Sequence, residues 1–169
     1  MPFDLPPVTR NLLIANVAVF LLQQVMGQVL LLNFALWPLG SGLFGVWQIV
    51  TSAFMHGSIT HIAFNMFALY MFGGTIERTF GARNFTVYYF VCAVVASLLQ
   101  LAVLWFLPPP QYGPTLGASG AIFGLLLAFG MLYPHEKVML IFLPIPMPAW
   151  LFVSLYAAAE LTMGVTGIE

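Results

Sequence analysis

The chain carries five apolar runs, each of a length that crosses a bilayer as one helix. They cover residues 12–32, 49–73, 85–107, 116–132 and 150–167. Because about 20 helical residues span the hydrocarbon core, these runs constrain the fold more than any other feature of the sequence. Residues 138–143 are also apolar, but this run is too short to span and is followed by alternating prolines. We expect it to form a cytoplasmic interfacial loop that leads into the fifth span.

The composition agrees with an integral membrane protein. Apolar residues make up 62% of the chain, charged residues make up 5%, and the mean hydropathy is +1.01. So few polar side chains could not cover the core of a soluble protein. Four basic and five acidic side chains, with a net charge of −1, provide no basic patch for nucleic acid. The single cysteine, Cys92, cannot form an internal disulfide.

The basic residues fall in alternate connections between the apolar runs. Arg10 precedes the first run, Arg78 and Arg83 lie between the second and third, and Lys137 lies between the fourth and fifth. Positive charge stays on the cytoplasmic side, so we expect the amino terminus inside and the connections after spans one and three outside. Without an internal repeat or a linker, we expect one bundle and one domain.

Polar side chains within the spans gather near the outer face. His61 and Asn65 are four residues apart in the second span and therefore share a helix face. His56 lies where the chain enters this span, and Ser119 lies near the outer end of the fourth span. Since both spans begin outside, we expect the four side chains at similar depth. Polar residues in a membrane are costly, so this cluster is a candidate functional site.

Two structural explanations compete with a catalytic one. Gly117, Gly120 and Gly124 are expected on nearly one helix face, which alone indicates a packing seam with Ser119 bonded to a nearby carbonyl. His61 and Asn65 alone indicate interhelical hydrogen bonds of about 1 kcal/mol. Because Ser119, His56, His61 and Asn65 are expected at the same depth in the membrane, however, their combination favours an acyl-transfer site. A serine nucleophile needs a base and donors for an oxyanion, and an amide and a neutral imidazole are suitable donors.

From about Trp47 onward, the chain resembles the rhomboid intramembrane serine proteases. The resemblance is carried by the run WQIVTSAFMHGSITHIAFNMFALYMFGGTIERTFGARNF, followed later by GASGAIFG. The motifs that match are the His-x-x-x-Asn of the second helix (His61, Asn65), the loop histidine (His56), the Gly-x-Ser-Gly motif (Gly117, Ser119, Gly120) and the Glu-Arg pair (Glu77, Arg78).

The resemblance implies an all-α, polytopic membrane helix bundle, with about five transmembrane helices present of a six-helix core. It implies a serine endopeptidase that cleaves transmembrane or juxtamembrane segments of membrane proteins, needs no metal or other cofactor and lies in a bacterial inner membrane. Its partners would be these substrates and the lipid bilayer. The implied site consists of the nucleophile Ser119, the oxyanion donors His61, Asn65 and the Ser119 N–H, and the site-ordering residues His56, Gly117 and Gly120.

One departure from the family concerns the catalytic base. The family carries it as a histidine on the sixth helix, and residues 1–169 contain no such span. His135 is expected in a cytoplasmic connection, across the membrane from Ser119, and cannot be the base. A dyad of Ser119 with His61 would consume an oxyanion donor. We therefore expect a single rhomboid-like domain over 1–169 that is truncated at its carboxyl end and inactive as written.

Other functions remain open. A rhomboid-like pseudoprotease would bind transmembrane helices without cleaving them, and a transporter or channel would need ionisable residues along a path, for which only Glu160 is a candidate. A zinc protease would need His-Glu-x-x-His, which is missing, and a lipase elbow is incomplete at Ala121. A second departure is Gln48, which follows Trp47 where the family often has Arg, and it puts the positioning of that loop in question.

Overall fold

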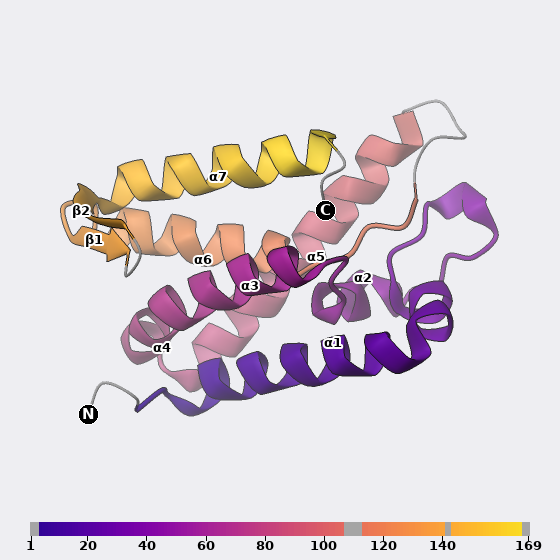
Figure 1. Cartoon of the computed structure of the whole chain (residues 1–169), viewed down its shortest axis with the longest axis horizontal. Coiled ribbons are helices and arrows are strands. Elements are labelled where there is room, and N and C mark those ends of the chain that lie inside the picture. Colours follow the sequence, from indigo (N-terminus) through magenta and orange to yellow (C-terminus); the bar gives the residue numbers. More distant parts are fainter. Residues whose placement is uncertain (1–3, 107–112, 141–142, 167–169) are drawn as a thin grey trace.

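The structure is a computed structural model that describes residues 4–106, 113–140 and 143–166. Its helices are α1 (Pro7–Phe34), α2 (Gln48–Thr51), α3 (Ile59–Ala68), α4 (Gly74–Phe80), α5 (Ala82–Phe106), α6 (Ser119–Leu132) and α7 (Ala149–Thr166), arranged as Figure 1 shows. Shorter turns are η1 (Leu39–Ser41) and η2 (Ser52–Phe54), both 3-10, and η3 (Leu69–Gly73), which is π-helical. Two strands, β1 (Lys137–Leu140) and β2 (Leu143–Pro148), form an antiparallel hairpin.

The apolar helices correspond to the predicted membrane spans. Among the described residues, three segments are long and apolar enough to cross a membrane: α1, the continuous run Ile59–Phe80 that α3, η3 and α4 form together, and α5. The helices α6 and α7 are also apolar, over Ser119–Leu132 and Ala149–Ala158, but shorter. The predicted fold class, an all-α polytopic membrane bundle, is confirmed.

Two predicted helix starts were wrong. The second span was expected to begin at residue 49, but residues 48–58 form α2, η2 and a loop, and the spanning helix begins at Ile59. Ser58 caps this helix, because its Oγ accepts a hydrogen bond from the His61 N–H at 3.0 Å. The fourth span was expected to begin at residue 116, but α6 begins at Ser119. Gly117 has a φ of +129° and lies ahead of the helix, so it does not share a helix face with Gly120.

The expected interfacial loop at residues 138–143 was also wrong, since residues 138–140 lie in β1 and residue 143 begins β2. Val138 pairs with Met147, and Val138 is buried against the core. A hairpin satisfies backbone groups that a segment too short to span would otherwise leave unpaired. Residues 107, 141, 142 and 167, which end or interrupt predicted segments, lie outside the described residues, as does the side chain of Glu160.

The helices alternate in direction, so the chain connections gather at two ends of the molecule (Figure 1). The start of α1, the α4–α5 turn and the β1–β2 hairpin lie at one end, and these are the connections that carry the four basic residues. The α1–α3 connection and the end of α5 lie at the other end. Between them, α6 occupies the centre and contacts α3, η3, α5 and α7.

Small residues let α6 approach α5 closely. A Cβ at Gly120 would overlap the Ala96 side chain, and a Cβ at Gly124 would overlap Cys92. The Tyr88 hydroxyl donates a hydrogen bond of 2.6 Å to the Gly124 carbonyl. The predicted close packing at Gly120 and Gly124 is therefore confirmed, and the helix that uses it is α5.

A buried carboxylate joins α1 to α4. Glu77 is 2% exposed and accepts hydrogen bonds from the Val8 N–H at 3.0 Å, the Thr9 N–H at 2.7 Å and the Thr9 hydroxyl at 2.8 Å. These donors lie in the first turn of α1, where backbone N–H groups have no partner within the helix and a negative charge is stabilised. The next residue, Arg78, donates to the Asp4 carbonyl at 2.6 Å. These contacts fix the start of α1 against the spanning helix that carries the candidate site.

Candidate active site

Ser119 is the first residue of α6, and the backbone ahead of it is held by two other parts of the chain. Thr115 pairs with Leu36 through hydrogen bonds of 2.8 and 2.9 Å, and the Gly117 N–H donates to the Ser52 carbonyl at 3.0 Å. The first N–H groups of a helix lack intrahelical partners and lie at its positive end. The Ser119 N–H is thus suited to stabilise a developing negative charge.

The His61 ring lies directly beside Gly117. A Cβ at Gly117 would lie 2.6 Å from His61 Cε1, 2.7 Å from His61 Nε2 and 3.6 Å from Ser119 Oγ. Atoms at 2.6 Å would overlap, so only glycine leaves room for the imidazole here. The positive φ of Gly117 also suits glycine. The structure therefore brings together three of the residues singled out from the sequence.

His56 lies in the loop ahead of α3 and packs on His61. The two ring centroids are 5.1 Å apart at an interplanar angle of 69°, and His56 is 2% exposed. Burial lowers the pKa of His56 to about 3, helped by the neighbouring His61 and opposed by the nearby Phe54 backbone. His56 is therefore neutral at pH 7. Within the described part of the chain, no ring nitrogen of His56 or His61 has a hydrogen-bond partner.

Asn65 follows His61 by one helical turn and is fully buried. Its Nδ2 donates to the His61 carbonyl at 3.1 Å, while its Oδ1 has no partner among the described residues. One of the two amide hydrogens of Nδ2 is thus used within α3. The other is available as a donor to a group outside the helix.

A cavity of about 210 Å³ adjoins Ser119. It has room for several water molecules or for one side chain. Its polar lining includes Ser52, Ser97 and Gln100, which the sequence analysis did not single out. Gln100 could have been found as an amide inside an apolar span. The cavity is lined by Leu36, Ser52, Ala53, Ala93, Ala96, Ser97, Gln100, Thr115, Leu116, Gly117, Ser119, Gly120, Ala121 and Phe123.

Gly120 lines this cavity but also packs on Ala96 of α5. The close contact between α6 and α5 is therefore enough to explain why residue 120 is a glycine, and Gly120 needs no direct role in the site.

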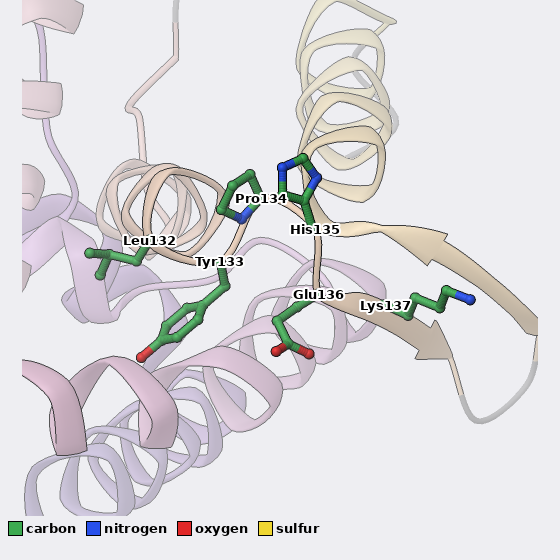
Figure 2. Close-up of a pocket in the computed structure, with 6 residues that line it drawn as sticks. All are labelled: Leu132, Tyr133, Pro134, His135, Glu136 and Lys137. Atoms are coloured by element: carbon green, nitrogen blue, oxygen red, sulfur yellow. The ribbon is translucent and has the colours of Figure 1, made fainter.

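His135 lies beyond the opposite end of α6, which has 14 residues and is therefore about 21 Å long. Figure 2 shows it in an open pocket of about 520 Å³ lined by residues 132–137. His135 is therefore too far from Ser119 to accept its proton directly.

The loop between α1 and α2 is anchored by Gln48, the residue noted above as a departure from the arginine that often follows Trp47 in the family that the sequence resembles. Gln48 is fully buried, its Nε2 donates to the Leu43 carbonyl at 2.9 Å, and its Oε1 accepts from the Trp37 N–H at 3.2 Å. Trp47 adds a hydrogen bond of 2.7 Å from Nε1 to the Asn33 carbonyl. An arginine could not accept from Trp37, because its side chain only donates. The departure at Gln48 thus leaves the loop held in place.

These features define a polytopic helical membrane protein with a serine at the start of a short helix. A family model described as the Rhomboid domain matches residues 43–169. The chain belongs to the rhomboid family.

Several curated proteins are similar to the chain. It is 41% identical over 103 residues to Rhomboid protein 1, mitochondrial, of Saccharomyces cerevisiae, covering 61% of this chain and 30% of that protein. It is 34% identical over 157 residues to RHOMBOID-like protein 12, mitochondrial, of Arabidopsis thaliana, covering 85% and 46%. It is 31% identical over 121 residues to Rhomboid protease GlpG of Klebsiella pneumoniae, covering 71% and 41%. The matches thus cover less than half the length of each of these relatives.

Proposed function

We propose that the protein is an intramembrane serine endopeptidase in which Ser119 attacks a peptide carbonyl in a transmembrane or juxtamembrane segment of another membrane protein. The observation that carries this proposal is the position of the His61 ring, which packs on Gly117 beside Ser119 at the start of α6. Membership of the rhomboid family and a relative named as a protease support the same class of reaction.

In the proposed reaction, Ser119 Oγ loses its proton to a base and bonds to the carbonyl carbon. The carbonyl oxygen becomes an oxyanion, which the His61 ring N–H, the Asn65 amide and the Ser119 backbone N–H would stabilise. Collapse releases the amine product, which takes up the proton, and leaves an acyl ester on Ser119. Water then attacks the ester to release the acid and restore the hydroxyl. The cavity beside Ser119 gives room for that water.

The base in this proposal lies outside residues 1–169. His61 is assigned to the oxyanion, the His56 ring packs on His61, and His135 lies beyond the far end of α6. We propose that residues 1–169 form one domain, which a further helix with a histidine completes in the full-length protein. Intact mass and sequencing of the carboxyl-terminal peptide of protein purified from its source test this directly. A full-length protein without another histidine near Ser119 would support a pseudoprotease instead.

We also propose a location in a bacterial inner membrane, with the amino terminus in the cytoplasm. The gathering of all four basic residues at one end of the bundle supports this orientation. The substitutions Gly113→Cys and Asn84→Cys, each made alone in a Cys92→Ala background, test it with a maleimide that does not cross membranes. We expect labelling of intact cells at position 113 and not at position 84. The reverse pattern would contradict the orientation.

Labelling of Ser119 tests the proposed chemistry. A fluorophosphonate that phosphonylates activated serines should form an adduct on Ser119 of the full-length protein, identified by peptide mass. The nearby Ser97 serves as a control, because it lines the same cavity but does not begin a helix. An adduct on Ser97 and none on Ser119 would contradict the assignment of the nucleophile.

A further inference from the structure

We propose that Gln23 of α1 is a positioning residue that holds His56 against His61, and thereby holds the His61 ring beside Ser119. This inference rests on the proposed function, because it concerns an oxyanion donor. Neither Gln23 nor its contact with the loop histidine was identified from the sequence.

Gln23 pairs with the backbone of His56 in both directions. The His56 N–H donates to Gln23 Oε1 at 3.0 Å, and Gln23 Nε2 donates to the His56 carbonyl at 3.1 Å. Two hydrogen bonds to one residue fix its orientation as well as its distance. A single side chain of α1 therefore anchors a loop that lies 33 residues later in the chain.

The loop depends on Gln23 because, in the described part of the chain, the His56 side chain makes no hydrogen bond that would anchor the loop. Both ring nitrogens of His56 lack hydrogen-bond partners within the described residues, and the ring touches His61 edge to face. The loop is also tied to η2 by the Met55 N–H, which donates to the Ser52 carbonyl at 3.1 Å. That bond lies before His56. Among the described residues, Gln23 makes the side-chain hydrogen bonds that fix the His56 backbone itself.

The contacts continue from His56 to the nucleophile. The His56 ring packs on the His61 ring, and the His61 ring lies where a Cβ of Gly117 would be. The start of α1 is itself fixed by Glu77. A displacement of the His56 loop would remove one wall of the space that holds the His61 ring. Displacements of about 1 Å reduce rates by about a hundredfold where catalytic groups must be aligned.

The next residue provides a matched control. Gln24 is exposed, and its Nε2 donates at 3.1 Å to the carbonyl of Phe20 in its own helix. Gln23→Met and Gln24→Met therefore make the same chemical change one position apart on α1. Gln23→Glu is the conservative variant, since a carboxylate keeps the acceptor for the His56 N–H but loses the donor for its carbonyl.

Histidine NMR of the full-length protein in detergent micelles tests the positioning without reference to activity. Burial holds the pKa of His56 at about 3, and His61 is the titratable group that faces it. In Gln23→Met we expect the midpoint to move up towards the ordinary value of about 6.5, because a released loop admits water. In Gln24→Met it should stay unchanged. An unchanged His56 titration in Gln23→Met would overturn the proposal.

Turnover of a transmembrane substrate tests the consequence for catalysis. We expect kcat to fall by about tenfold to a hundredfold in Gln23→Met, with KM unchanged, an intermediate value in Gln23→Glu and wild-type kcat in Gln24→Met. Wild-type kcat in Gln23→Met would overturn the link to the oxyanion donor. If the wild-type protein cleaves nothing, the proposed function fails, while the histidine titration still decides whether Gln23 positions His56.

Discussion

At the scale of single residues, Gly117 is the position on which the candidate site depends most. Its φ of +129° and the His61 ring 2.6 Å from a hypothetical Cβ leave no room for a side chain. We expect Gly117→Ala to displace His61, to abolish turnover and to lower the free energy of unfolding by about 1–3 kcal/mol.

Gly113→Ala is the matched control for this substitution, because nothing lies within 4 Å of its Cβ position. Turnover and thermal unfolding of both variants in detergent give the comparison. Wild-type turnover in Gly117→Ala would show that the His61 ring need not lie at its observed position.

Substitution of Asn65 tests whether its amide is an oxyanion donor or has a purely structural role. It is fully buried and donates to the His61 carbonyl. We expect Asn65→Ala to lower kcat by up to about a hundredfold or more, the loss associated with one oxyanion donor. Turnover per folded molecule is the measurement, with the folded fraction taken from thermal unfolding. A loss of stability with intact turnover would assign Asn65 to structure alone.

His56 links stability to pH. Its pKa is about 3 in the folded protein and about 6.5 when unfolded, so between these values the unfolded state binds more protons. Stability is therefore fully present above pH 6.5 and falls as the pH drops towards 3, by up to about 1.4 kcal/mol per pH unit.

The free energy of unfolding in detergent at pH 7 and pH 5 measures this effect in the wild-type protein and in His56→Phe. We expect a smaller decrease in the variant, because its ring cannot be protonated. Equal decreases in the two proteins would assign the acid sensitivity to other groups.

At the scale of elements, the contact between α5 and α6 makes a separate prediction. A Cβ at Gly124 would overlap Cys92 Sγ, whereas a Cβ at Gly130 would meet Val153 at an ordinary 3.6 Å. We expect Gly124→Ala to lower the free energy of unfolding by about 1–3 kcal/mol through overpacking. Gly130→Ala should change it little. Adding Cys92→Ala to Gly124→Ala, which removes Sγ but keeps Cβ, should restore part of the loss, and failure of this rescue would show that the Cys92 sulfur is not the main obstruction.

The helices themselves were largely predictable from the sequence, and their starts were not. Apolar runs identify membrane spans because the hydrocarbon core demands about 20 consecutive apolar residues. An apolar run does not show whether its first residues are helical or belong to an apolar loop ahead of the helix. The predicted fourth span therefore included Gly117, which lies ahead of α6 in the structure. The π-helical turn η3 and the β1–β2 hairpin were also missed. Neither has an apolar period that distinguishes it in a uniformly apolar chain.

At the scale of the whole molecule, the sequence predicted candidate site residues but not the contacts that hold them in place. The four-residue spacing of His61 and Asn65 was sufficient to place them on one face of α3. The pairing of Gln23 with His56 and of Glu77 with Thr9 joins residues 33 and 68 positions apart. Such contacts depend on how the helices pack against one another, and the local pattern of residue types along the chain does not predict that packing.

Cleavage of a model transmembrane substrate in proteoliposomes tests the central claim most directly. The full-length protein and its Ser119→Ala variant are compared at equal folded concentration. We predict that the wild-type protein cleaves the substrate and that Ser119→Ala, which lacks the nucleophile, leaves it intact. Equal cleavage by both proteins would contradict the role of Ser119, and binding without cleavage by both would identify a rhomboid-like protein that recognises membrane helices without cutting them.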